Sequence, residues 1–153
     1  MKKLYILKAG SALHEVITTD GDFDTLIIKK SGIPASSCVT IKNFSYYHYR
    51  VPSDAGGFII TGSHAMVTDN EPWILQLSRM IREITDSGIP LLGICFGHQV
   101  ITAALGGKVE NLSASIEIGT VGIKQEAQAY DDLLLKNLPY SFMAFASHMQ
   151  TVK

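Results

Sequence analysis

The segment from Ile89 to Gln99 constrains the fold of this chain more than any other. A near-continuous apolar run of strand length, Ile89–Ile94, leads into the pattern Gly-x-Cys-x-Gly at residues 93–97 and then into a helical pattern. Continuous apolar strands are typical of parallel sheets that are covered on both faces. We therefore expect a strand buried on both faces that turns directly into a helix.

Short apolar runs and helical patterns alternate along the rest of the chain. We expect further strands at Lys3–Leu7, Cys38–Ile41, Gly57–Thr61, Ile116–Lys124 and Phe142–Ala146. We expect helices from Asp22 to about Lys30, with Gly32 as the stop, from Pro72 to Gly88, and from Cys95 to Gly106-Gly107. Such alternation is typical of an α/β fold, and no linker-like tract divides the chain. Residues 1–153 are thus expected to form one domain.

The amino-acid composition limits the classes of molecule that this protein is expected to bind. The 13 Lys and Arg residues nearly balance the 14 Asp and Glu residues, so the net charge of −1 offers no patch for nucleic acid or an anionic membrane. No segment reaches the ~18 apolar residues of a membrane span. The two cysteines, Cys38 and Cys95, come with no export signal, which favours reduced thiols. We expect a cytoplasmic protein that binds neither nucleic acid nor membrane.

Cys95 stands where a nucleophile elbow places its nucleophile, on a sharp turn between a strand and a helix. Such a turn brings the residues two before and two after it close to neighbouring backbone, and Gly93 and Gly97 meet that demand. Unpaired N–H groups and the helix dipole at a helix start favour a thiolate. The alternative is a buried apolar cysteine whose glycines serve only packing, and the paired glycines make it the weaker interpretation.

These residues resemble the class I (triad-type) glutamine amidotransferases, whose signature Gly-Ile-Cys-aromatic/Leu-Gly-x-Gln matches Gly93–Gln99. Within that family the chain is most similar to the GMP-synthase-like branch. The segments that carry this resemblance are Thr61-Gly62-Ser63, Asp69, Glu71–Ile74, Glu117-Ile118-Gly119 and Ser147-His148. The resemblance implies a flavodoxin-like fold, an open and mostly parallel sheet with helices on both faces. It also implies that residues 1–153 form an amidotransferase domain that is incomplete at its C-terminus.

The resemblance implies a specific chemistry for Cys95. Its thiolate would attack the side-chain amide of glutamine, ammonia would leave, and water would hydrolyse the γ-glutamyl thioester to glutamate. By the elbow geometry the backbone N–H of Phe96 would bind the oxyanion, and by resemblance Gly62 would supply the second donor. Both act through backbone, so we expect Phe96 to tolerate a change of side chain and Gly62 not to.

Further residues are assigned to the substrate by resemblance alone. Gln99 matches the family glutamine that contacts the substrate; taken by itself it would be a solvated helix position. The family holds the α-amino and carboxylate groups of glutamine at positions that match Ser147, His148, Met149 and Gln150. Met149-Gln150 replaces the usual Gly-Asp there. No cofactor is implied, and the cysteines and histidines show no metal-ligand spacing.

The general base is the missing part. The family takes its catalytic pair from a later His-Pro-Glu, and no His-x-Glu occurs among these 153 residues. His98 is expected to point away from the elbow, and His64 could line the pocket. His14 and His48 are expected in loops or solvent, whereas His148 matches a substrate-region histidine. We expect a truncated chain rather than a complete one that has lost its triad, with negligible glutaminase turnover and an alkylatable Cys95.

Two other functions stay open. One is another γ-glutamyl hydrolase with the same cysteine elbow; the peptidase/chaperone branch of the superfamily usually has histidine after the nucleophile, and Phe96 stands there instead. The other is a non-catalytic domain that binds or regulates a synthetase. If the chain is an amidotransferase, its expected partners are L-glutamine and a synthetase subunit that accepts the ammonia.

Overall fold

The computed structural model describes residues 1–44, 50–113 and 116–153, so His48 lies outside the described residues. The chain divides into two compact units. Unit 1 comprises residues 1–110 with 152–153, and unit 2 comprises residues 111–151. The one-domain expectation stays a prediction. None of the helices in the described part of the chain has both the length and the apolar character needed to cross a bilayer.

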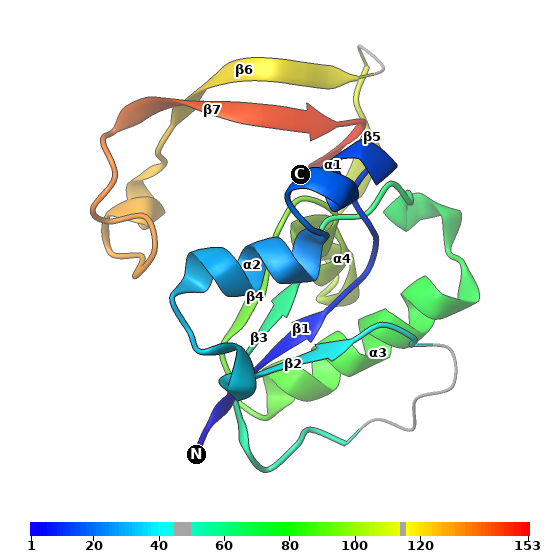
Figure 1. Ribbon diagram of the computed structural model, residues 1–153. Coiled ribbons are helices and arrows are strands. Elements are labelled where there is room, and N and C mark those ends of the chain that lie inside the picture. The colour runs from blue at the N-terminus through cyan, green and yellow to red at the C-terminus, as the bar shows by residue number, and fades with distance from the viewer. Residues whose placement is uncertain (45–49, 114–115) are drawn as a thin grey trace. The chain divides into compact units, whose positions relative to one another are not determined.

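Unit 1 is built on a parallel four-stranded sheet with the order β2-β1-β3-β4 (Figure 1). Its strands are β1 (Lys3–Leu7), β2 (Cys38–Ile41), β3 (Ala55–Ile60) and β4 (Leu91–Gly93). Tyr5 lies opposite Val39 on one side and Phe58 on the other, and Ile59 lies opposite Leu92. Because the strands are parallel, their carboxyl ends meet at one edge of the sheet, where ligands bind in open α/β folds.

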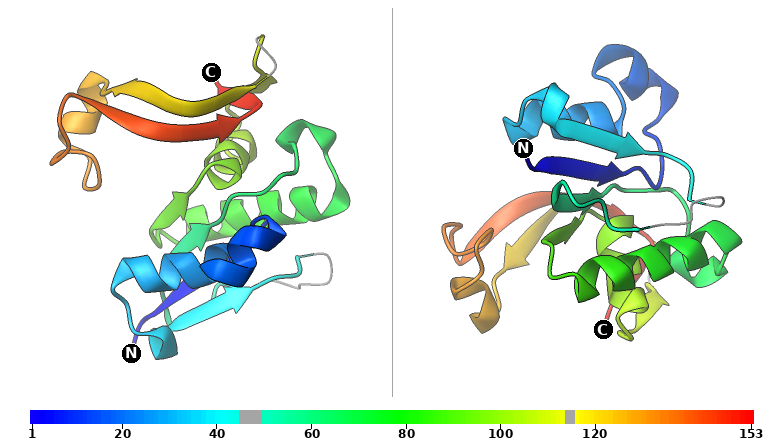
Figure 2. Two further views of the ribbon diagram at one scale, coloured as in Figure 1. Left: turned by 45° about the horizontal axis from the view of Figure 1, so that its top comes forward. Right: turned by 90° about the horizontal axis from the view of Figure 1, so that it is seen from below.

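Helices cover both faces of this sheet. Figure 2 shows α1 (His14–Thr19) and α2 (Phe23–Ser31) on one face, and α3 (Pro72–Asp86) and α4 (Phe96–Ala104) on the other. Short 3₁₀ turns, η1 (Ala35–Ser37) and η2 (Val67–Asp69), complete the unit. The predicted α/β fold with a mostly parallel sheet is confirmed.

Local chemistry explains the helix boundaries. Asp22 caps α2 by accepting a hydrogen bond from the Phe23 amide, and Gly32 ends the helix with φ of 69°, a conformation that favours glycine. Pro72 begins α3, where its missing N–H costs nothing. The apolar face of α3 is buried, through Ile74, Leu77, Met80, Ile81 and Ile84. These boundaries were predicted from the sequence to within about two residues.

The expectation of a strand buried on both faces at Ile89–Ile94 is wrong. β4 is only three residues long, and Leu92 and the following Ile94 are 36% and 43% exposed. The cause is topological: β4 ends the strand order, so among the described residues of unit 1 no strand covers its outer side. An apolar sequence indicates a tendency to be buried, but not which neighbour is present.

Unit 2 contains the antiparallel pair β6 (Glu117–Lys124) and β7 (Ser141–His148), with Ile118 opposite Ser147 and Lys124 opposite Ser141. This pair confirms the two strands expected in the last third of the chain. β5 (Val109–Asn111) and β8 (Gln150–Val152) form a further sheet of two strands.

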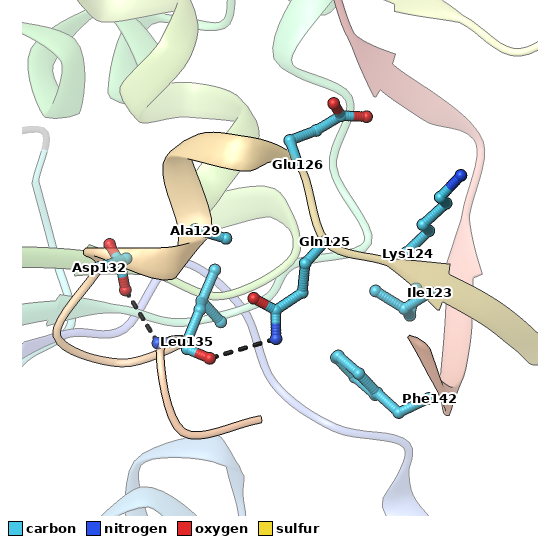
Figure 3. Close-up of a pocket in the computed structure, with 8 residues that line it drawn as sticks. All are labelled: Ile123, Lys124, Gln125, Glu126, Ala129, Asp132, Leu135 and Phe142. Carbon is cyan, nitrogen blue, oxygen red and sulfur yellow. Dashed lines mark hydrogen bonds between the residues drawn. The ribbon is translucent and has the colours of Figure 1, made fainter. Parts of the chain in front are cut away.

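The connection from β6 to β7 contains η3 (Ala127–Tyr130) and surrounds a cavity of about 370 Å³. Gln125 is buried beside it, and its Nε2 donates to the carbonyl oxygen of Leu135 at 3.2 Å (Figure 3). The same nitrogen donates to the carbonyl oxygens of Leu138 and Pro139, each at 3.0 Å. Three carbonyl acceptors fix the orientation of the side-chain amide, because only its nitrogen can donate. Gln125 therefore holds this connection in place.

Candidate active site

Cys95 occupies a strained turn between β4 and α4. Its φ of 53° and ψ of −111° lie outside the ordinary regions, and among the described non-glycine residues only Asn70 shares a positive φ. Strain of this kind persists only where the surroundings impose it, and it is characteristic of a nucleophile elbow. The residue is exposed and is not part of a disulfide. The elbow predicted at this position is therefore present.

Gly93 and Gly97 allow the turn because no side chain fits at either position. A Cβ on Gly93 would lie 2.4 Å from the Gly97 carbonyl carbon and from the His98 nitrogen. A Cβ on Gly97 would lie 2.4 Å from the carbonyl oxygen of Ile60 in β3. All of these obstacles are backbone atoms, so a side chain could not be accommodated by rotamer changes.

Gly62 and Phe96, the two expected oxyanion donors, both lie next to Cys95. A Cβ on Gly62 would lie 3.8 Å from the Cys95 Cβ, so the turn after β3 adjoins the elbow. Phe96 is the first residue of α4, and the first N–H groups of a helix have no partner within it. The Gly62 turn and the start of α4 thus both adjoin Cys95, and the role of their N–H groups as oxyanion donors stays a prediction.

The expectation that Phe96 tolerates a change of side chain stays a prediction, and the packing of the side chain argues against a small replacement. Its side chain is 0% exposed, and its ring centroid lies 5.6 Å from that of Trp73, which in turn stacks with Phe44 at 6.3 Å. The side chain of Phe96 therefore anchors the start of α4 in the core, next to Cys95.

Gln99 lies one helical turn beyond Cys95 and is only 6% exposed. Its backbone amide donates to the Cys95 carbonyl oxygen at 3.2 Å. The interpretation of Gln99 as a solvated helix position is therefore wrong. Its contact with a substrate stays a prediction.

The histidines of unit 1 that the structure describes are all on the surface. His98 is exposed on α4, His64 is exposed after the Gly62 turn, and His14 is exposed at the start of α1. Exposure of His14 agrees with the sequence-based expectation, whereas the expectation that His98 points away from the elbow stays a prediction. A role for His64 in lining the pocket stays a prediction.

The four remaining substrate candidates belong to unit 2 and cluster where β7 leads into β8. Ser147 and Met149 are exposed, whereas Gln150 is buried and donates from Nε2 to Asn111 Oδ1 at 3.0 Å. His148 Nε2 lies 3.0 Å from Glu117 Oε2 on the neighbouring strand. The side chains of His148 and Gln150 thus have partners within unit 2, and the role of all four residues in substrate binding stays a prediction.

One residue that the sequence did not single out also reaches the site. Phe23 is the first residue of α2. A Cβ on Gly62 would lie 3.8 Å from the Phe23 ring atom Cε2 and also 3.8 Å from the Cys95 Cβ. The sequence indicates only that Phe23 begins a helix after Asp22. The spatial neighbourhood of Phe23 and Gly62 depends on how β1 and β3 pair, which a single sequence does not encode locally.

Several known proteins are similar to this chain in sequence. The family described as "Glutamine amidotransferase class-I" matches residues 39–153. A glutamine-hydrolyzing GMP synthase subunit from Methanococcus vannielii is 31% identical over 126 residues, covering 82% of this chain and 59% of that protein. Gamma-glutamyl peptidase 4 of Arabidopsis thaliana is 34% identical over 98 residues, covering 63% of this chain and 39% of that protein.

Solved structures share the fold. The crystal structure of a glutamine amidotransferase from Thermotoga maritima matches with a TM-score of 0.75 at 18% identity, covering 100% of this chain and 63% of that one. The chain thus spans less than two thirds of the length of each of these three proteins.

Proposed function

Because the chain belongs to the class-I glutamine amidotransferase family, we propose that Cys95 is the nucleophile that attacks the side-chain amide of glutamine. The observation that carries this proposal is the strained turn at Cys95, which adjoins both the Gly62 turn and the start of α4. A reactive thiol needs exposure as well as a nearby positive potential, and Cys95 is exposed at the start of α4.

The proposed reaction has two passages through a tetrahedral oxyanion. The Cys95 thiolate attacks the amide carbon, the oxyanion collapses, and the C–N bond breaks while the leaving NH2 group takes up a proton from the general acid and departs as ammonia. Water then attacks the γ-glutamyl thioester and releases glutamate and the thiolate. The N–H groups of Gly62 and Phe96 would stabilise the negative oxygen in both passages.

Proton transfer requires a base that the proposal places outside residues 1–153. No His-x-Glu occurs among them, and His64 and His98 are exposed. We include in the proposal a histidine and a carboxylate from further chain. The relative from Methanococcus vannielii is named as one subunit of GMP synthase, which supports an ammonia-accepting synthetase as partner. The proposed location is the cytoplasm, in keeping with two cysteines outside any disulfide.

We expect the 153-residue chain to release ammonia from glutamine at a negligible rate and yet to retain a substrate-protected Cys95. Loss of a triad member leaves only the residual catalysis of the oxyanion hole and binding. The measurement pairs an ammonia assay with the rate of Cys95 alkylation by iodoacetamide, with and without L-glutamine. L-Asparagine, one methylene shorter, is the matched control and should protect less.

Ammonia release at the rate of a complete amidotransferase would contradict this expectation. In that event His148 becomes the first candidate for the base, because Glu117 already lies 3.0 Å from its Nε2. His148→Gln would then abolish the release, whereas His98→Gln would not.

A second candidate function is hydrolysis of a γ-glutamyl peptide bond. It is favoured by the 34% identity to gamma-glutamyl peptidase 4 over residues that make up 63% of this chain. The same thioester chemistry applies, with an amine in place of ammonia as the leaving group. A γ-glutamyl dipeptide that protects Cys95 from alkylation better than L-glutamine does would favour this candidate over the first.

A further inference from the structure

A group of partly buried charges lies close to the Gly62 turn and is not used in the proposed reaction. Lys8 follows β1, and its Nζ contacts Asp22 Oδ2 and, at 3.2 Å, Asp24 Oδ1. The three side chains are only 10%, 14% and 13% exposed. Burying an ion pair often gains little stability compared with apolar packing, because desolvation offsets the attraction. The position of the group therefore needs another explanation.

Asp22 connects three parts of the chain at once. While Oδ2 faces Lys8, Oδ1 accepts hydrogen bonds from the Ala12 amide at 2.8 Å and from the Phe23 amide at 2.7 Å. Burial alone would raise the pKa of Asp22, but the hydrogen bonds from Lys8 and the two amides hold it well below its ordinary value. The carboxylate is thus ionised at neutral pH and fixes the segment after β1 to the start of α2.

The segment after β1 is in turn fixed to the Gly62 turn. The Ala9 amide donates to Thr61 Oγ1 at 3.0 Å, and that hydroxyl donates to the Gly62 carbonyl oxygen at 2.9 Å. Gly10 permits the close approach, since a Cβ there would lie 2.6 Å from Ser63 Cα and 3.0 Å from the Gly62 oxygen. The backbone of residues 9–10 therefore packs directly against residues 61–63.

Phe23 forms a second connection to the same glycine. The Phe23 amide donates to Asp22, and the Phe23 ring lies beside Gly62. A Cβ on Gly62 would be 3.8 Å from the ring atom Cε2, as far as it would be from the Cys95 Cβ. A displacement of Asp22 would therefore change the position of Gly62 in two ways, by moving the backbone of Ala9–Gly10 and by moving the ring of Phe23.

We propose that Asp22, which is paired with Lys8, is a positioning residue for the backbone donor at Gly62. Phe23, whose amide is bound by Asp22, keeps the glycine in place by packing against it. The proposal rests on the proposed function, because it assumes that Gly62 stabilises an oxyanion. Displacement of a preorganised donor by about 1 Å is enough to cost up to about a hundredfold in rate.

The test compares two alkylating reagents on the same thiol. A chloromethyl ketone analogue of glutamine places a carbonyl oxygen where the oxyanion forms; the Cys95 Sγ–C bond forms and chloride leaves with the C–Cl electron pair. Iodoacetamide alkylates the thiol at a saturated carbon, with iodide as the leaving group, and does not depend on oxyanion stabilisation. The ratio of the two rate constants therefore reports the oxyanion site separately from the reactivity of the thiol.

Asp22→Asn removes the charge that holds Lys8 while keeping an acceptor for the two amides, and Phe23→Leu removes the ring while keeping an apolar side chain. Both variants are expected to lower the ketone rate constant about tenfold and to leave the iodoacetamide rate constant unchanged. The matched control is Asp54→Asn, which breaks another ion pair of β1, with Lys3 at 2.8 Å, and a hydrogen bond from Tyr5. The control should leave the ratio unchanged.

The outcomes separate this inference from the function on which it rests. If L-glutamine does not protect the unmodified chain from the ketone, the proposed function fails. If glutamine protects, but both variants keep the ratio of the unmodified chain, the positioning role is wrong and the function stands. If Asp22→Asn does not fold by circular dichroism, Phe23→Leu decides, since it leaves the charges of Lys8, Asp22 and Asp24 intact.

Discussion

Gly97→Ala is expected to lower the free energy of unfolding by about 3 kcal/mol. The new Cβ would lie 2.4 Å from the Ile60 carbonyl oxygen and 2.9 Å from its carbon. Because these are backbone atoms of a central strand, α4 would have to move away from β3, and the elbow would move with it. Urea unfolding monitored by the fluorescence of Trp73 measures the loss.

Gly57→Ala is the matched control for Gly97→Ala. Gly57 also belongs to the sheet, but a Cβ there would make only ordinary contacts, 3.7 Å to the Pro90 oxygen and 3.9 Å to Leu4. Alanine at that position is expected to be neutral or to stabilise by a few tenths of a kcal/mol, up to about 1 kcal/mol, through the unfolded chain. Equal unfolding free energies for the two variants would show that α4 does not pack on β3 as described.

Phe96→Ala is expected to cost about 4 kcal/mol, the range for removing a fully buried aromatic ring. It should also shift the emission of Trp73, whose ring lies 5.6 Å away. Phe96→Leu should recover a large part of the stability, because it refills most of the cavity.

Leu105→Ala provides the comparison for the Phe96 variants. Leu105 caps the other end of α4 and is exposed, so its truncation is expected to change the unfolding free energy by no more than about 0.5 kcal/mol. A Phe96→Ala protein as stable as Leu105→Ala would support the sequence-based prediction that Phe96 tolerates a change of side chain.

Local signals in the sequence were sufficient for much of the fold. Asp22 and Gly32 define α2 through capping chemistry, and Pro72 with the apolar face after it defines α3. The elbow was predictable for the same reason, because a turn that admits no Cβ at two positions leaves a spacing of glycines around Cys95. Features of this kind depend on a few consecutive residues.

Features that depend on distant neighbours were not predictable. The exposure of Leu92 and Ile94 follows from the place of β4 in the strand order, and the burial of Phe96 and Gln99 follows from what packs on α4. The contact of Asp22 with Lys8 joins positions 14 apart that share no periodic pattern. Burial and charge pairing of this kind arise from tertiary packing, which overrides local propensity.

The central claim is that Cys95, and no other thiol, captures the side chain of glutamine. Cys38 is an internal control, because it is the second cysteine outside any disulfide. Cys38 begins β2, and its Sγ contacts the carbonyl oxygen of Pro34 at 3.6 Å. The most direct measurement is mass-spectrometric localisation of the adduct formed with the chloromethyl ketone analogue. We expect one adduct, on Cys95, that disappears with excess L-glutamine and in Cys95→Ser. Equal modification of Cys38 and Cys95, unaffected by glutamine, would contradict the claim.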